Sequence, residues 1–92
     1  MSVTPLHLSG SLTVDEAANV LVAMCAAVDA GCQEVRLEHL QTVDSAAVAT
    51  LLAARRHAQQ KGVDLRFSPP PPALAGLIGL YEVAALLGPP LP

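Results

Sequence analysis

Residues 34–62, EVRLEHLQTVDSAAVATLLAARRHAQQKG, contain a strand, a short loop and a helix in direct succession. Apolar and polar residues alternate over residues 34–40, which predicts a strand. Ala, Val and Leu then recur at three- and four-residue spacing until Gly62, which predicts a helix with one side facing a core. The loop ends in Asp44 and Ser45. A small polar residue at the start of a helix is typical of an N-cap, so we expect one of these two to cap the helix.

The two sides of this helix differ in character. The expected core side holds Ala47, Val48, Leu51, Ala54, Arg55 and Ala58, with Leu52 at its border. The opposite side begins with small residues, whereas a solvated face would normally carry Glu and Lys. Small residues on an outer face allow another helix to approach closely. The candidate partner-binding residues are therefore Asp44, Ser45, Ala46, Ala49 and Ala53, with Arg56 as a rim contact.

On the N-terminal side of this stretch, the sequence predicts one more strand and one more helix. The alternating LHLSGSL at residues 6–12 predicts the strand. Thr13 and Glu16 then have the spacing of a capping box, and apolar residues at helical spacing continue to Gly31, the expected left-handed C-cap. Residues 1–5 are expected to add a further strand. In the strand at residues 34–40, Val35, Leu37 and His39 are expected on the core face, with Arg36, Glu38 and Leu40 on the other.

On the C-terminal side, VDLRFS at residues 63–68 predicts a third strand. Four prolines follow it, and Pro72 is suited to the first turn of a helix. Apolar residues at helical spacing over residues 74–85 predict a last helix, and residues 88–92 form a proline-broken tail. The order β-α-β-α-β-α with short links predicts an α/β fold with mainly parallel strands.

Composition limits the class of protein. Ninety-two residues, 52% hydrophobic and 14% charged, predict a single domain over residues 1–92. A net charge of −3 and one Phe with one Tyr argue against nucleic-acid binding. No apolar run reaches the length of a membrane span, and no signal-peptide pattern opens the chain. Cys25 and Cys32 lie too far apart along a helix for a disulfide, since seven helical residues rise roughly 10 Å. We expect reduced cysteines, a cytoplasmic location, and no metal or cofactor.

The order of elements and three segments together resemble the STAS domain, the fold of bacterial anti-sigma factor antagonists such as SpoIIAA. The segments are LSGSLTVDEA at residues 8–17, TVDSAAVATLL at 42–52 and PPALAGLIGLYEVAALL at 71–87. The resemblance covers nearly the whole chain and implies a small mixed sheet with helices. In the antagonists the turn has Asp-Ser-Ser-Gly or Asp-Ser-Thr-Gly, and a partner kinase phosphorylates the second hydroxyl. Ala46 and Ala47 stand at the second and third of those positions after Asp44, so Ser45 is the acceptor that remains.

A second branch of the family, the MlaB-like subunit of the lipid-asymmetry ABC transporter, is more similar. Its turn keeps one Ser or Thr directly after the Asp, and its last helix has the pattern L-x-x-L-Y-x-V, which residues 77–83 match. This resemblance implies a non-enzymatic cytoplasmic protein, peripheral at the inner membrane, that binds the ATPase of a phospholipid transporter with a permease and a substrate-binding protein. Ser45 and its helix are then the contact.

Other interpretations of Ser45 remain open from the residues alone. Capping is by itself a sufficient reason for a Ser at this place. A nucleophile needs a base, and neither His39 nor His57 has a catalytic motif around it, so an enzyme is not expected. Partner switching with an anti-sigma factor kinase requires phosphorylation of Ser45. The low charge and alanine-rich face also predict self-association of the isolated chain.

Overall fold

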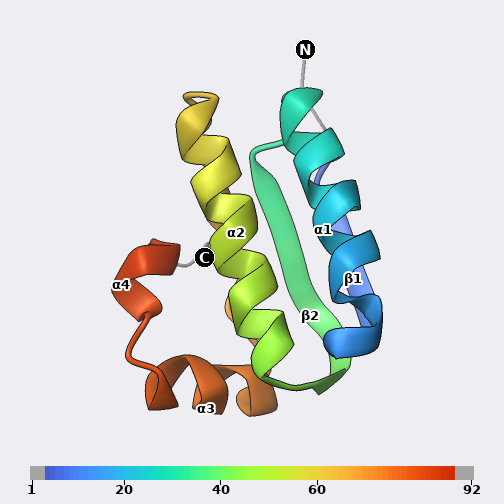
Figure 1. The fold of residues 1–92 in the computed structure, drawn as a ribbon, viewed down its shortest axis with the longest axis vertical. Helices are drawn as coiled ribbons and strands as arrows, with labels where there is room; N and C mark the ends of the chain where they lie inside the picture. The colour runs from blue at the N-terminus through green and yellow to red at the C-terminus, as the bar shows by residue number, and fades with distance from the viewer. Residues whose placement is uncertain (1–3, 89–92) are drawn as a thin grey trace.

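The computed structural model describes residues 4–88, and strands and helices alternate along most of that length (Figure 1). The elements in chain order are β1 (Leu6–Leu12), α1 (Val14–Asp29), β2 (Glu34–Val43), α2 (Ser45–Gln60), β3 (Arg66–Phe67), α3 (Pro72–Leu80) and α4 (Ala84–Leu87). The α/β class and the order of the elements are confirmed. None of the helices in residues 4–88 combines the length and apolar content needed to cross a bilayer.

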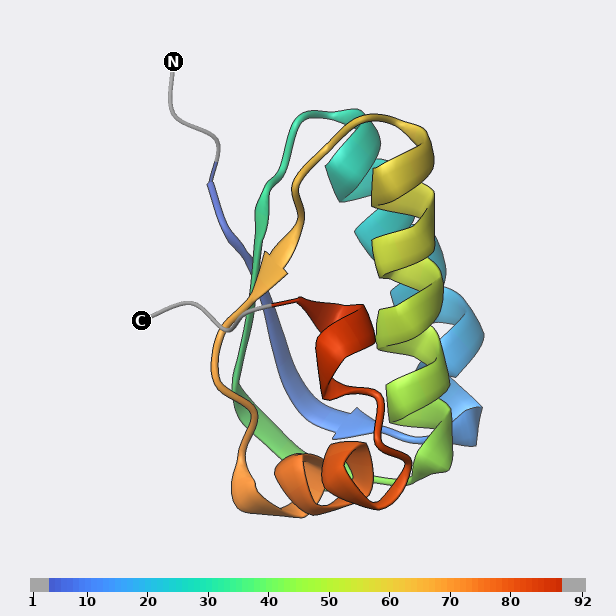
Figure 2. The ribbon, with the colours of Figure 1, turned by 90° about the vertical axis from the view of Figure 1, so that its left-hand side faces the viewer.

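The three strands form one sheet in the order β1-β2-β3, and both pairings are parallel. Helices α1 and α2 lie side by side on one face of this sheet (Figure 2). Residues 4 and 5 are not in a strand, so the predicted additional strand is absent there, and its remainder falls on residues 1–3, outside the described residues. Within residues 4–88 the sheet is therefore parallel rather than mixed.

Strand β2 runs three residues further than predicted, and its faces change partway along. Leu40, expected on the outer face, is 5% exposed, whereas His39, expected in the core, is exposed. Between His7 and Ser9 of β1, the paired position in β2 advances from Arg36 to His39. One extra residue in β2 shifts the side-chain alternation by one, which turns Leu40 inward and His39 outward.

Strand β3 is shorter than the predicted residues 63–68, although Leu65, Phe67 and Ser68 are all buried. The Ser68 N–H donates to Val35 O at 2.9 Å, and the Ser68 hydroxyl accepts the Leu37 N–H at 2.6 Å. The next residue is a proline without an N–H, so the backbone pairing ends at this point.

The last predicted helix is divided in two. Helix α3 begins at Pro72, as expected for a first-turn proline, and is followed by a turn at residues 81–83 and the four-residue α4. Glu82 has φ of 56°, its N–H donates to Gly79 O at 3.2 Å, and the Val83 N–H donates to Ile78 O at 3.3 Å. These two bonds form a Schellman motif, which ends α3 where apolar periodicity alone predicts continuation.

The core lies between the sheet and the helices. Its fully buried large side chains include Leu12, Met24, Leu37, Leu51, Leu65 and Leu74. The capping box of Thr13 and Glu16 is confirmed at the start of α1, and Gly31 has the left-handed φ of 99° expected after its end. No disulfide joins the half-buried Cys25 to the buried Cys32.

Candidate partner-binding surface

Asp44 joins the starts of the two long helices. Its carboxylate accepts the Ala46 N–H at 2.8 Å as the N-cap of α2, and it also accepts the Val14 N–H of α1 at 3.2 Å. Because β1 and β2 are parallel, both helices begin at the same edge of the sheet, and one carboxylate can serve both free N-termini. Of the two residues expected to cap this helix, Asp44 is therefore the cap, and its role extends to a second helix.

A second carboxylate lies at this edge. The Thr13 N–H and hydroxyl donate to Glu16 Oε1 at 2.9 and 2.8 Å. These hydrogen bonds, the backbone one above all, lower the pKa of the half-buried Glu16 carboxyl, while the charge of Asp44 acts in the opposite direction. The edge of the sheet at which α1 and α2 begin, next to the candidate surface, is therefore anionic at neutral pH.

Ser45 is the first residue of α2 and is exposed. The interpretation of Ser45 as a simple N-cap is wrong, because the Asp44 carboxylate already occupies that role. His57 is twelve residues further along the helix, roughly 18 Å away at a rise of about 1.5 Å per residue. No hydrogen bond joins Ser45 to a histidine within residues 4–88, and His57 instead lies 2.8 Å from Asp29.

Two apolar grooves meet on the outer face of α2. The first, which we call the turn groove, is lined by Ser45, Val48, Ala49, Leu52, Tyr81 and Val83. The second, the interhelix groove, lies between α1 and α2 and is lined chiefly by Ala17, Ala18, Leu21, Ala46, Ala49 and Ala53. Ala49 is exposed and belongs to both, so small side chains on α2 make a shallow ridge between two hollows.

The structure thus brings four of the six candidate residues together. Ser45, Ala46, Ala49 and Ala53 line the two grooves, while Asp44 lies half-buried beneath them as the cap. Arg56 is exposed in a third groove, between α2 and α4, with Leu52, Arg55, Gln59, Ala85 and Leu86. Leu52 also lines the turn groove, so Arg56 is at the rim of the same continuous face.

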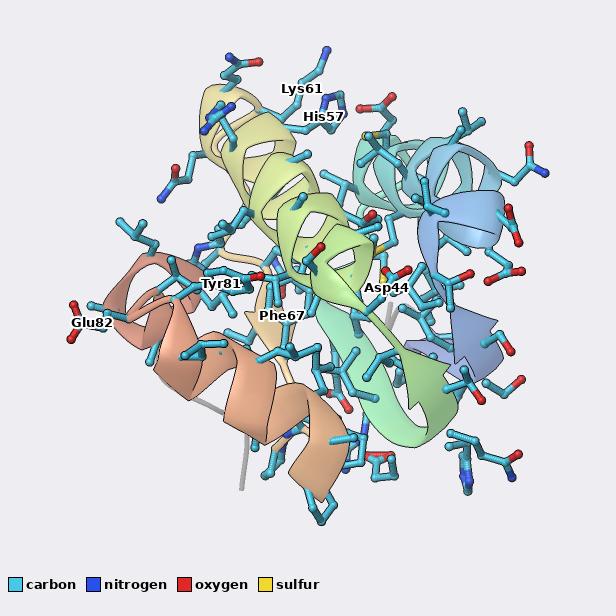
Figure 3. All side chains as sticks on the ribbon, turned by 60° about the horizontal axis from the view of Figure 1, so that its bottom comes forward. Asp44, His57, Lys61, Phe67, Tyr81 and Glu82 are labelled. Atoms are coloured by element: carbon cyan, nitrogen blue, oxygen red, sulfur yellow. The ribbon has the colours of Figure 1, made fainter. Side chains whose placement is uncertain are left out.

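Sequence reasoning missed the far walls of both grooves. Tyr81 is 48% exposed and, with Val83, comes from the turn between α3 and α4 (Figure 3). Its position follows from the Schellman turn, and periodicity placed it in a continuous helix. For the wall formed by α1, the sequence does contain a signal from which an exposed apolar face could have been predicted. Residues 17–28 carry no charge, and a helix that is apolar on all sides is usually buried on all sides.

The three histidines, the other candidate catalytic or metal-binding residues, lie on three different elements of the fold. His7 and His39 are exposed on separate strands, and His57 is at the far end of α2. Among the described residues, no three His, Cys, Asp or Glu side chains converge where they could hold a metal ion.

The comparisons with known proteins agree with this fold. A family model described as "Mlab, STAS domain" matches residues 2–88. No match was found among curated proteins. Among solved structures, the chain is similar to the "Structure of the Anti-Sigma Factor Antagonist SpoIIAA in its Unphosphorylated Form", with a TM-score of 0.72 and 16% identity over 94% of this chain and 81% of that chain. The likeness to that structure shows a shared fold and confirms the predicted one.

Proposed function

We propose, from the premise that this chain belongs to the MlaB-type STAS domain family, that it is a non-enzymatic subunit of an ABC phospholipid transporter. In this proposal it binds the ATPase subunit and regulates or stabilises it, and the transporter maintains outer-membrane lipid asymmetry. The chain itself is cytoplasmic and reaches the inner membrane only through its partner. The permease and the substrate-binding protein join through the assembled complex.

The observation that carries the proposal is the exposed ridge at Ala49 between the turn groove and the interhelix groove. A helix of a partner can approach this ridge closely because no side chain longer than a methyl group projects from Ala46, Ala49 or Ala53. Side chains of that helix then enter the two grooves on either side. Arg56 at the rim adds a charge whose effect falls mainly on the association rate and on specificity.

In this proposal the chain acts on the ATPase only through the free energy of binding. A subunit that contacts the ATPase more favourably in its assembled form shifts the ATPase toward that form, by no more than the difference between the two affinities. No group of the chain takes part in ATP hydrolysis.

We predict that Ser45→Arg abolishes binding to the ATPase subunit. An arginine at the mouth of the turn groove brings bulk and an unpaired charge into an apolar contact, at a cost of several kcal/mol, which corresponds to roughly a hundredfold or greater loss of affinity. Binding is measured by isothermal titration calorimetry with the purified ATPase, and folding by circular dichroism.

The matched control is Ala23→Arg, which adds the same side chain to an exposed position of α1 outside both grooves. It is expected to bind as the wild type does. Wild-type affinity of the Ser45→Arg variant, or equal losses for both variants, contradicts the proposed surface.

A second candidate function is partner switching, as an anti-sigma factor antagonist or related signalling protein. The exposed Ser45 hydroxyl favours it, because a kinase can reach a side chain in this position. A phosphate at a helix N-terminus is favoured by the helix dipole but opposed by the adjacent Asp44 carboxylate. Intact-mass analysis after incubation with a cognate kinase tests this, since Ser45→Ala must abolish any added phosphate.

A further inference from the structure

An apolar pocket of about 130 Å³ lies beneath α4. Its walls include Leu51, Phe67, Ile78 and Leu87, and the labelled Phe67 is seen in the interior between α2 and the C-terminal helices (Figure 3). Ser68 is the one hydroxyl among the lining residues, and that hydroxyl already accepts the Leu37 N–H. A pocket of this kind does not hold water well, and an engineered apolar cavity of about 150 Å³ in another protein takes up benzene.

The cover of this pocket is weakly held. Helix α4 has four residues and no side-chain cap, and it is flanked by two left-handed positions, Glu82 with φ of 56° and Gly88 with φ of 84°. So short a helix has no stability of its own, so burial of Leu87 is what holds it in place. The segment between the two left-handed residues can therefore move aside at low cost and admit an alkyl chain.

Cationic groups lie beside the same segment. Gly88 lines the pocket, and a Cβ placed there would lie only 2.8 Å from Arg55 Nη2. Arg55 Nη1 donates to Leu65 O and is 3.7 Å from Asp64 Oδ1, but its buried Nε has no hydrogen-bond partner in residues 4–88. Arg56 lines the groove between α2 and α4 together with Arg55, and it has no ion pair within the described part of the chain.

We propose that this region binds an anionic amphiphile with a single alkyl chain. The end of the chain occupies the pocket beneath α4, and the anionic head lies against Arg55 and Arg56 beside Gly88. Each methylene removed from water favours binding, and the guanidinium groups discriminate in favour of a negative head. A carboxylate and a phosphate monoester share this chemistry. The pocket shares no lining residue with the turn groove or the interhelix groove, and only Arg56 at the rim is common to both surfaces. The inference does not depend on the proposed transporter partner.

The test titrates the full chain with decanoate, decyl phosphate, decanol and decyltrimethylammonium, each below its micelle concentration. Amide chemical shifts report the place of binding and calorimetry the affinity. Both anions are expected to shift α4 and Phe67 amides, with decanol about tenfold weaker and the cation without effect. The tighter of the two anions identifies the head group.

Two variants with a matched control locate the site. Ala84→Phe fills the pocket and is expected to lower the affinity for both anions and for decanol by tenfold or more. Arg56→Gln is expected to weaken anion binding about fivefold without changing decanol binding. Ala23→Phe, on exposed α1, should bind as the wild type does. Equal affinities for decanoate and decanol, or undiminished binding by a folded Ala84→Phe variant, overturn the proposal.

Discussion

The helix pair α1/α2 and the C-terminal segment α3/α4 belong to the same small domain, but they are stabilised in different ways. Both long helices begin with a side-chain cap, and at their other ends His57 of α2 lies 2.8 Å from Asp29 of α1. Neither α3 nor α4 has a side-chain cap, and a left-handed Glu82 lies between them. Side-chain caps and a contact between the two helices therefore add to core packing in the first region, while docking onto the core alone holds the second.

The difference bears on the candidate surface, because the turn groove has one wall in each region. Ser45 and Ala49 are on the locally stabilised α2, and Tyr81 is on the turn that only docking holds. A partner at this surface would contact both walls, so its affinity includes any cost of fixing the turn. The interhelix groove, built from two capped helices, carries no such cost.

The largest effect is expected from Leu74→Ala. Leu74 is 0% exposed in α3, and removing a buried leucine side chain typically lowers the free energy of unfolding by about 2–5 kcal/mol. If docking alone holds the C-terminal segment, amide hydrogen exchange should accelerate over α3 and α4 well before it does in α1 and α2. Urea denaturation measures the total loss, and hydrogen exchange measures its distribution.

Leu80→Ala is the matched control for that experiment, since Leu80 is in the same helix but 72% exposed. It should change stability by less than about 0.5 kcal/mol. Uniform loss of protection throughout the Leu74→Ala variant would show that the two regions unfold as one unit, and the contrast drawn between them would be wrong.

Asp44→Ala tests the other side of the comparison, with an intermediate effect. The substitution leaves the N–H groups of Val14 and Ala46 without their acceptor and should destabilise the domain by about 1–2 kcal/mol. Thermal denaturation of both proteins at neutral pH gives the difference. Protection should fall in the first turns of both α1 and α2.

Asp44→Asn is the control, because an amide oxygen still accepts one N–H and asparagine is as good an N-cap as aspartate. It should recover most of the stability that alanine loses. If asparagine is as destabilising as alanine, the negative charge rather than the cap is what the two helix N-termini require.

The same division explains how far the sequence alone could lead. Thr13, Glu16, Asp44 and Gly31 are signals that act within a few residues of themselves, and both long helices were predicted close to their observed bounds. The extra residue in β2 depends on pairing with β1, so alternation within β2 placed His39 and Leu40 on the wrong faces. The Schellman turn has Glu82 at its left-handed position, so it lacks the glycine by which such a turn is usually recognised in a sequence. For that reason the wall of the turn groove formed by Tyr81 and Val83 was missed. For Ser45, only the position on α2 could be predicted.

Glu82→Gly should give the smallest effect, a gain in stability. A left-handed conformation costs a residue with a Cβ about 1–2 kcal/mol, and glycine avoids that cost but loses about 0.5–1 kcal/mol through greater freedom in the unfolded chain. A net gain of about 0–1.5 kcal/mol follows, measurable by urea denaturation. The Glu82 side chain is exposed and points away from the molecule (Figure 3), so its removal loses few contacts.

Glu82→Ala is the control that distinguishes the effect of the backbone conformation from that of the charge, because it removes the carboxylate but keeps the Cβ. Only glycine should stabilise the fold. If alanine does so equally, the charge of Glu82 is the destabilising feature, and the backbone conformation does not account for the weaker hold on the C-terminal segment.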